Sequence, residues 1–281
     1  MLAIAFPAVM TSPGCGADAQ RPVCEEPVLQ RRDSGQVSFS FPGSDAVRTL
    51  DIFIYADSPT RPLLWHTRTG HTESLRFPLD GDCTAVAIAN APGEFNLDAL
   101  KAMDSIEKLE MQYAAENSLF PTMSGLTPLS KDEPQGVIRL TPLLCKVSLY
   151  AICNSTGRRI ESLSIRFADA NSSAELLRSE GFRPVQTISG PDGLLSPELF
   201  SAKFAFDIGI PTVHPGLNLY CYPNDSEEET PGTPRTTLII EGFINKRSCT
   251  WSIPLPPIKR GADIKVEVDI LSPESLNWSC F

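Results

Sequence analysis

The sequence of 281 residues is poor in positive charge and contains no long hydrophobic run. Its 24 Lys and Arg residues stand against 34 Asp and Glu residues, which gives a formal net charge of −10. The basic residues form no dense cluster, so the electrostatic footprint of a nucleic-acid-binding protein is missing. Apart from the first dozen residues, no apolar stretch approaches the roughly 18 to 20 residues that a membrane-spanning helix needs. We therefore expect no nucleic-acid partner and no transmembrane helix in the mature protein.

The sequence also lacks the common motifs of catalytic and metal sites. It has no G-x-S-x-G, no G-x-x-x-x-G-K-[ST] and no C-x-x-C. Of its three histidines, His66 and His71 have a spacing that suits neither one helix face nor alternate strand positions, and His214 precedes a proline in a predicted turn. We expect a protein that is not an enzyme and has no catalytic residue, no metal and no cofactor.

Acidic residues gather in two places, and neither has the spacing of a known site. Glu25 and Glu26 form a pair, and the run NDSEEETPGTP covers residues 224–234. The run lacks the regular acidic positions and the closing Glu of an EF-hand loop. We interpret it as a solvated loop after a strand, which can also contact a partner.

Three tryptophans are candidates for stacking on sugars. They are Trp65, Trp251 and Trp278. Trp251 alternates with Ile253 in a predicted strand, and we therefore expect it in the core.

The N-terminus resembles an export signal. Residues 2–10 are mostly apolar, which is the length of a signal-peptide core, and small residues precede Cys15 as they do at a lipid-accepting cysteine. However, no Lys or Arg precedes Cys15, and Ser12 stands where such a motif usually has Leu. Lipidation of Cys15 after removal of residues 1–14 is the favoured interpretation. Ordinary signal cleavage and a plain disordered N-terminus are the alternatives.

Eight cysteines are compatible with an oxidising, extracytoplasmic location. If Cys15 carries lipid, seven remain, and an odd number leaves at least one thiol unpaired. Cys145 and Cys153 share one parity of a strand-like run with Val147 and Leu149. We therefore expect both to be small apolar side chains that face a core. The disulfide pairing stays open.

Most of the chain consists of short alternating runs separated by some of its 25 prolines and 18 glycines, which is typical of an all-β protein. Polar residues 15–36 are interpreted as a tether. Strands are predicted over residues 50–56, 83–89, 146–152, 162–168, 203–210, 217–222 and 263–271. Residues 236–255 are predicted to form a hairpin that turns at Asn245, Lys246 and Arg247, with Gly242 as a candidate bulge.

One helix is predicted within this β-rich chain, over residues 96–111. Apolar residues recur there every three positions from Leu97 to Leu109, and Asn96 can serve as the N-cap. The fold class is therefore all-β with a minor helix. Two β-sandwich domains are expected, over residues 37–137 and 138–281.

The order of several segments resembles a known family. These segments are LDIFIYA, VAIANAP, the helix, LFPTMSG, RLTPLLCKVSLYAI and WSIPLPPIKRGADIKVEVDIL, together with the export signal. In this order they are similar to the type V fimbria subunits of Bacteroidales, the fimbrillins and their associated anchor proteins. The resemblance covers roughly residues 37 to 271 by pattern more than by identity.

The resemblance implies two tandem transthyretin-like sandwiches, export as a lipoprotein and assembly with other fimbrial subunits by donor-strand addition. It makes Cys15 the lipid site and Arg31 and Arg32 the candidate cleavage point. In such subunits, removal of the first strand leaves a groove for a strand of the neighbouring subunit, because unpaired backbone groups and an apolar groove bind an extended peptide.

The last residues of the sequence also alternate. Leu276, Trp278 and Cys280 are predicted to form a short strand, which either packs on its own domain, as we favour, or is donated to a neighbour.

The favoured function is a structural protein of the cell surface and outer membrane, namely a fimbrial anchor or accessory subunit. One alternative is a polymerising stalk or tip fimbrillin that is processed after Arg31 or Arg32. Another is a glycan-binding surface lipoprotein, and a host or bacterial surface ligand is compatible with each of them.

Overall fold

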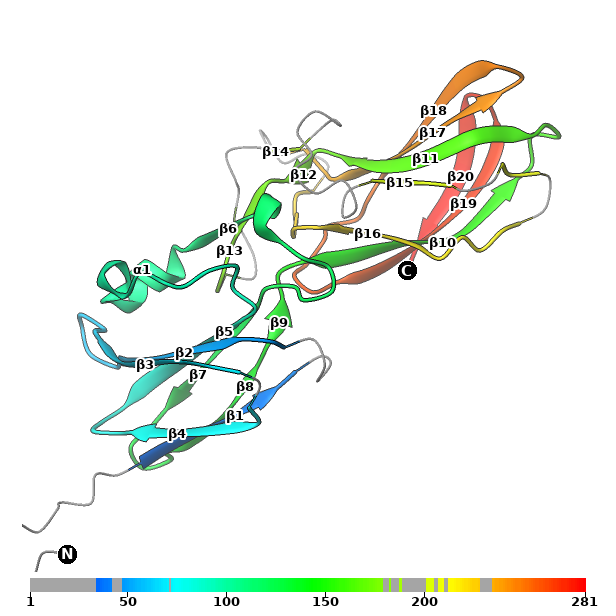
Figure 1. The fold of residues 1–281 in the computed structure, drawn as a ribbon. Helices are drawn as coiled ribbons and strands as arrows, with labels where there is room; N and C mark the ends of the chain where they lie inside the picture. The colour runs from blue at the N-terminus through cyan, green and yellow to red at the C-terminus, as the bar shows by residue number, and fades with distance from the viewer. Residues whose placement is uncertain are drawn as a thin grey trace, which may run out of the picture. The chain divides into compact units, whose positions relative to one another are not determined.

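The computed structural model describes residues 34–41, 47–70, 72–178, 182, 187–188, 201–204, 207–209, 212–227 and 234–281. Nearly all of its regular elements are β-strands, arranged in several sheets (Figure 1). The predicted all-β class with a minor helix is therefore confirmed. None of the helices in these ranges is long and apolar enough to cross a membrane.

The first sheet is built around the first strand of the described chain. Its spatial order is β4 (Ser74–Pro78), β1 (Ser34–Ser40) and β8 (Gln135–Arg139). β1 is antiparallel to β4 and parallel to β8. Residues 34–36, which the sequence assigns to the tether, belong to β1 instead. Its sequence SGQVSFS hides the strand pattern because Gly35 takes an inward position, under the ring of Phe77.

The second sheet is antiparallel and packs against the first. Its strands, in spatial order, are β3 (Leu63–Thr69), β2 (Leu50–Ala56), β5 (Cys83–Ala89), β7 (Met123–Leu129) and β9 (Thr141–Pro142). Leu50, Ile52 and Ile54 of β2 face the first sheet, while Phe53 and Tyr55 face the helical segment. Both faces of the central strands β2 and β5 are therefore buried, which explains why these strands are so apolar.

The predicted helix over 96–111 is wrong in its length. The segment forms a 3₁₀ turn η2 (Leu97–Leu100), a short helix α1 (Met103–Glu107), the strand β6 (Glu110–Gln112) and a second 3₁₀ turn η3 (Tyr113–Ala115). Asn96 does cap η2, since its Oδ1 accepts from the backbone N–H of Asp98 at 3.1 Å. Ala102 interrupts the helix because it is extended and bridges to Pro62.

Two further sheets follow in the second half of the chain. The first is here called the β20 sheet, with the order β16 (Leu217–Cys221), β10 (Cys145–Asn154), β19 (Asp263–Ser272) and β20 (Ser275–Cys280). β10 is parallel to β19, and the other pairs are antiparallel. The last sheet holds β15 (Ser201–Lys203), β11 (Ile160–Ala168), β17 (Thr237–Ile244) and β18 (Arg247–Pro254).

The predicted hairpin of residues 236–255 is confirmed as β17 and β18. Its turn contains two residues, Asn245 and Lys246, both with positive φ, whereas Arg247 already belongs to β18. Gly242 is not itself bulged. The irregularity lies in the facing strand β11, where Ser162 has φ of 52°, and a Cβ on Gly242 would come within 3.0 Å of Leu163.

Small strand pairs complete the fold. β13 (Ser173–Glu175) pairs with β6, and β12 (Ala170–Asn171) pairs with β14 (Thr187–Ile188). One hydrophobic cluster fills the first pair of sheets. A second, larger cluster contains residues of β2, β5, the helical segment and both later sheets. The helical segment therefore joins the core of the second half to the outer face of the β2 sheet.

Candidate functional site

The strand most relevant to assembly is β1, at the centre of its three-stranded sheet. It forms five residue pairs with β4 and five with β8. Val37 and Phe39 point into the core, where Phe77 and Ile138 belong to the same cluster. Loss of β1 would leave two strands with unpaired backbone groups beside an apolar groove, which is the geometry that accepts an extended peptide.

The predicted N-terminal site residues lie outside the described residues. They are Cys15 and the arginines Arg31 and Arg32; the acidic pair Glu25 and Glu26, for which no site is predicted, also lies there. β1 begins at Ser34. A cut after Arg31 or Arg32 would therefore leave β1 attached to the chain, and the groove would stay filled.

A cut that frees β1 has to fall between Ser40 and Leu50. Arg48 is the one basic residue of that stretch. Its guanidinium carbon lies 3.4 Å from the centroid of the Phe120 ring, and its backbone N–H donates to Asn90 Oδ1 at 2.8 Å. The sequence prediction missed this position because it placed the first strand after Arg48.

The three candidate donor-strand residues lie in β20, at the edge of its sheet. β20 pairs with β19 over six residue pairs. Leu276 and Cys280 are half-buried against the core, whereas the Trp278 side chain is 42% exposed. The strand therefore packs on its own chain, which was the favoured expectation, and its donation to a neighbour stays a prediction.

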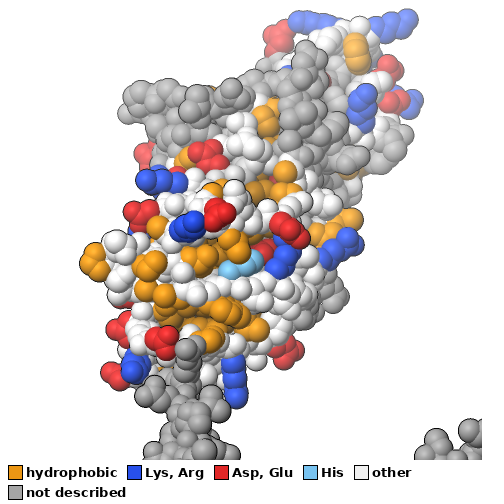
Figure 2. Space-filling model, turned by 60° about the vertical axis from the view of Figure 1, so that its left-hand side comes forward, with side chains coloured by type: hydrophobic (Ala, Val, Ile, Leu, Met, Phe, Trp, Pro, Cys, Tyr) orange, Lys and Arg blue, Asp and Glu red, His pale blue; other side chains and the backbone are white. Residues whose placement is uncertain are grey.

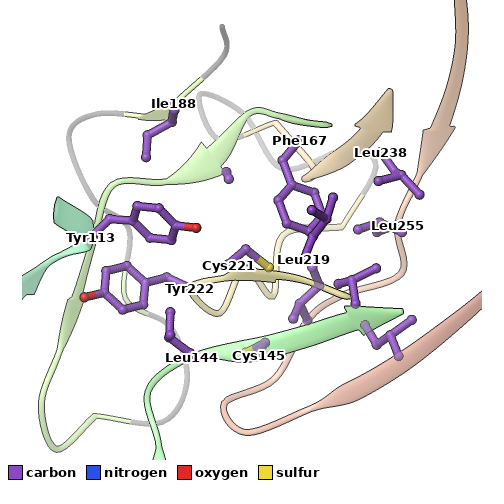
Figure 3. Packing of buried hydrophobic residues seen from close by; sticks show 14 of the residues in the cluster. Tyr113, Leu144, Cys145, Phe167, Ile188, Leu219, Cys221, Tyr222, Leu238 and Leu255 are labelled. Atoms are coloured by element: carbon purple, nitrogen blue, oxygen red, sulfur yellow. The ribbon is translucent and has the colours of Figure 1, made fainter. Parts of the chain in front are cut away.

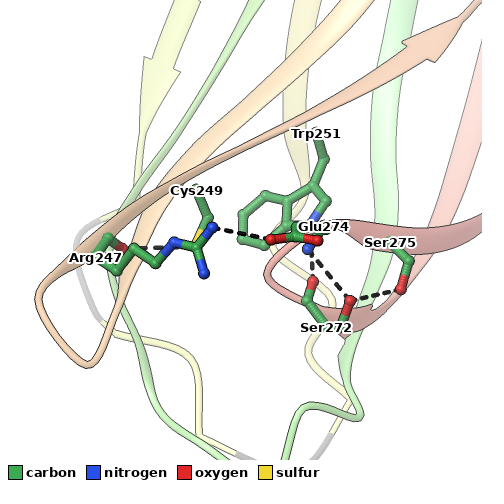
Figure 4. A network of polar contacts seen from close by, with 6 residues as sticks. All are labelled: Arg247, Cys249, Trp251, Ser272, Glu274 and Ser275. Carbon is green, nitrogen blue, oxygen red and sulfur yellow. Dashed lines mark hydrogen bonds and ion pairs between the residues drawn. The ribbon is translucent and has the colours of Figure 1, made fainter.

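Polar contacts from β18 hold the turn that leads from β19 into β20 (Figure 4). The Trp251 indole N–H donates to the Ser272 carbonyl oxygen at 3.0 Å, and Arg247 pairs with Glu274 at 2.9 Å. The hydroxyl oxygens of Ser272 and Ser275 form a hydrogen bond with each other at 2.7 Å. The β20 sheet and the sheet of β15, β11, β17 and β18 are thus tied together where β19 turns into β20.

The cysteine prediction holds for Cys145 and is wrong for Cys153. Cys145 is fully buried and lies opposite Cys221 in the pairing of β10 with β16. The register of β10 shifts between Leu149 and Ala151. This bulge reverses the alternation, so Cys153 is half-buried beside Ser155 on the outer face of the sheet.

His66 lies near the buried carboxylate of Asp51 on the outer face of the β2 sheet. Its Nε2 is 3.1 Å from Asp51 Oδ1, and its ring centroid is 4.5 Å from that of Phe53. Burial raises the pKa of the Asp51 carboxyl above its usual range. In Figure 2 a histidine has acidic and basic side chains beside it on a face with hydrophobic patches. His71 lies outside the described residues.

Metal and sugar candidates from the sequence are placed as follows. His, Cys, Asp and Glu side chains do not gather in threes that could hold a metal ion anywhere in the described ranges. Trp251 is buried in the core as predicted, with 3% of its surface exposed. Trp65 stacks on Phe77 with centroids 6.2 Å apart and packs against the first core.

The acidic run begins with a buried residue. Asn224 donates through Nδ2 to the Pro234 carbonyl at 2.9 Å and to the Thr236 hydroxyl at 3.1 Å. The interpretation as a solvated loop is therefore wrong at Asn224 and at Ser226, which are both buried. Residues 228–233, which hold most of the run, lie outside the described residues.

Arg260 is a half-buried cation that no sequence pattern singled out. Its guanidinium donates to the carbonyl oxygens of Leu176 at 2.7 Å and Thr141 at 2.8 Å, and to the Ser124 hydroxyl at 2.7 Å. Burial lowers its pKa to about 10. Because Arg260 follows β18 while Ser124 lies on β7, this side chain links the two halves of the described fold.

A second link surrounds the buried carboxylate of Glu116. Tyr222 donates its hydroxyl to one carboxylate oxygen at 3.1 Å, and the Thr122 N–H donates to the other at 3.1 Å. The rings of Tyr113 and Tyr222 meet edge to face with centroids 5.6 Å apart (Figure 3). Burial raises the pKa of Glu116.

Comparison with solved structures finds this fold in Bacteroidales surface proteins, although no family model and no curated protein matches the sequence. The tip fimbrial protein Mfa3 of Porphyromonas gingivalis, with C-terminal truncation, aligns with a TM-score of 0.56 at 10% identity over 88% of this chain and 99% of its own. A fimbrial assembly protein of Parabacteroides distasonis aligns with a TM-score of 0.53 at 10% identity, over 88% of this chain and 94% of its own.

A protein of Bacteroides eggerthii that is proposed to act in cell adhesion gives a TM-score of 0.63 at 13% identity, over 89% of this chain and 95% of its own. At these identities the likeness is one of fold. The fold is that of Bacteroidales fimbrial and adhesion proteins, as the sequence resemblance predicted.

Proposed function

We propose that this chain is a structural protein of the cell surface that serves as an anchor or accessory subunit of a fimbria. The observation that carries the proposal is the placement of β1, a short strand between β4 and β8 whose inward side chains complete the first core. The fold likeness to a tip fimbrial protein and a fimbrial assembly protein supports the same class.

Strand addition is the proposed mode of contact with other subunits. An incoming strand in the position of β1 would regain the backbone pairs with β4 and β8 and place side chains where Val37 and Phe39 lie. Burying each such side chain contributes about 1.5 to 3 kcal/mol, in addition to the backbone hydrogen bonds. A neighbouring subunit with an alternating strand is therefore a suitable partner.

Strand replacement can be tested on the folded full chain. A protease site is inserted within residues 42–46, the chain is cut after folding, and a fluorescent peptide with the sequence of residues 34–41 is added in excess. We expect the peptide to enter and the original segment to leave. A peptide with Val37→Asp is the matched control and should not enter, because it would bury a charge. Equal uptake of both peptides would contradict strand replacement.

Tethering through Cys15 is the second part of the proposal. Attached acyl chains contribute about 0.8 kcal/mol per buried CH₂, so two or more chains hold a protein stably on a membrane. Cys15→Ala should move the protein from the membrane fraction to the soluble fraction. Cys24→Ala is the control and should leave it in the membrane. Retention of the Cys15→Ala variant in the membrane would disprove the lipid tether.

A polymerising stalk or tip subunit is the main alternative. It requires a cut that releases β1, and a cut at Arg31 or Arg32 would not do so because β1 begins at Ser34. The contacts of Trp251 and Arg247 that fix the start of β20 also favour a subunit that keeps its last strand. Strand addition in the position of β1 requires a cut between Ser40 and Leu50 in either role, so the retention of β20 is the observation that favours an anchor or accessory subunit.

A further inference from the structure

The outer face of the β20 sheet has a hollow of about 470 Å³ that no sequence pattern indicated. Ala151, Cys153 and Ser279 contribute short side chains to it, between the longer side chains of His214 and Glu267. The bulge between Leu149 and Ala151 brings Ala151 and Cys153 to this face. The volume lies within the range of small-molecule sites.

The exposed side chain of Trp278 belongs to the lining of the hollow, and His214 in the same lining connects the hollow to two further exposed aromatic side chains, Tyr150 and Phe281. The ring of Tyr150 meets that of His214 with centroids 5.3 Å apart and that of Phe281 at 6.1 Å, both edge to face. His214 is held in place, because its Nδ1 lies 3.1 Å from the Tyr150 carbonyl oxygen. Tyr150 is 45% exposed and Phe281 62% exposed. Aromatic rings exposed in this way offer flat faces on which a ligand can stack.

The polar groups of the hollow favour a ligand with hydroxyls. Glu267, Asp269 and Asn277 lie beside the hydroxyls of Thr212 and Ser279 in its lining. Neither Glu267 nor Asp269 forms an ion pair with a described residue, although Asp269 accepts from the Ser155 hydroxyl at 2.6 Å. Carboxylates and amides placed in this way accept hydrogen bonds from neighbouring sugar hydroxyls.

The charges around the rings argue against ionic ligands. Lys265 Nζ lies 5.5 Å from the centroid of the Tyr150 ring and 6.0 Å from that of Phe281. This ammonium group lies beside both rings and would repel a ligand cation. Glu267 and Asp269 would repel an anionic ligand. A neutral ligand with apolar C–H faces and many hydroxyls fits both constraints.

We propose that this hollow is a binding site for a neutral oligosaccharide, with the hydroxyls of one sugar unit bonded to Glu267, Asp269 and Asn277 and a neighbouring unit packed on the rings of Tyr150 and Phe281 beside the hollow. The site lies on the β20 sheet and does not depend on β1. It therefore adds ligand recognition to the structural role proposed above.

The test uses the full chain on an array of neutral hexose and N-acetylhexosamine oligosaccharides of two to six units, with sialylated and sulfated glycans and basic peptides alongside. We expect binding to at least one neutral oligosaccharide. Tyr150→Ala and Phe281→Ala should each weaken that binding by about tenfold in calorimetry, since stacking on an aromatic ring contributes that much. Phe243→Ala is the matched control and should bind normally, because Phe243 is exposed on a strand of the other sheet.

Several results would overturn the proposal. One is failure of every neutral oligosaccharide to bind while circular dichroism shows a folded chain. Another is binding that survives both Tyr150→Ala and Phe281→Ala. A preference for sialylated or sulfated glycans or for basic peptides would assign the hollow to a different ligand. The double variant Glu267→Gln with Asp269→Asn distinguishes these cases further. It should weaken the binding of a neutral glycan and strengthen the binding of an anionic glycan.

Discussion

Trp251 Nε1 lies 3.0 Å from the carbonyl oxygen of Ser272 and joins β18 of one sheet to the end of β19 in the other. The indole is buried, so water does not replace this hydrogen bond when it is lost. Trp251→Phe keeps an aromatic ring but removes the donor and part of the volume. We expect a loss of about 1 to 3 kcal/mol in the free energy of unfolding, measured by urea denaturation.

The control for this variant is Trp278→Phe in β20. Because 42% of the Trp278 side chain is exposed, the change should stay within about 0.5 kcal/mol. Equal losses in the two variants would mean that the contact with Ser272 does not stabilise the sandwich.

Replacement of Arg260 should destabilise the described fold. Arg260→Met keeps much of the side-chain volume but leaves the carbonyls of Leu176 and Thr141 without their charged donor. We expect a loss of about 1 to 3 kcal/mol, because a polar group that loses its partner away from water costs about that much; the Leu176 carbonyl keeps the Ser124 hydroxyl as a donor.

Arg247→Met is the matched comparison for Arg260→Met. Arg247 forms an ion pair with Glu274, and the two side chains are 67% and 75% exposed. Such exposed pairs contribute at most about 1 kcal/mol. Urea denaturation of both variants checks the difference. A mild effect at Arg260 would show that the link between the two halves is not needed for stability.

Gly125 in β7 is required by close approach of the backbone. A Cβ at this position would lie 2.1 Å from the Arg139 carbonyl oxygen, which cannot rotate away. Gly125→Ala should therefore cost about 1 to 3 kcal/mol through displacement of β7 from β8. Gly81→Ala, where nothing lies within 4 Å, should be neutral, and thermal unfolding of the two variants separates these outcomes.

Stability should depend on pH through Glu116. Burial raises the pKa of its carboxyl above the ordinary value of 4.5, so the folded chain binds this proton more tightly than the unfolded chain does. The contribution of Glu116 is thus fully present below about pH 4.5 and is lost as the pH rises through the folded pKa. Glu116→Gln should flatten this part of a stability profile measured by urea denaturation.

Glu241→Gln serves as the control for the pH profile, because Glu241 is 41% exposed and paired with Arg166. It should leave the profile between pH 4.5 and neutrality nearly unchanged. The proposal for Glu116 fails if its Gln variant keeps the slope of the natural chain.

The sequence predicted the strands whose faces differ in polarity. β19 alternates Ile264, Val266 and Val268 with charged residues, and it forms where the pattern places it. β1 was missed because Ser, Gly and Gln fill most of its positions, and its partners β4 and β8 are distant in sequence. Parallel pairing with β8 is a tertiary property that no local period encodes.

The sequence predicted less of the candidate sites, because they depend on register and on long-range contacts. Cys153 was assigned to the core since alternation was extended through the bulge that follows Leu149. Arg260 gave no signal, because its acceptors are carbonyl groups contributed by three other elements. Tyr150 and Phe281 meet only when β10 and the end of the chain join the same sheet.

The most direct test of the central claim is the intact mass of the protein isolated from the membrane fraction. The account predicts acyl chains on Cys15 as the first residue, with residues 16–32 retained. An N-terminus at Asp33 would show loss of the tether with β1 still in place, whereas an N-terminus at Thr49, which removes β1, would favour the polymerising subunit. An unmodified Cys15 in a chain that still carries the residues before it would contradict the tethered cell-surface role.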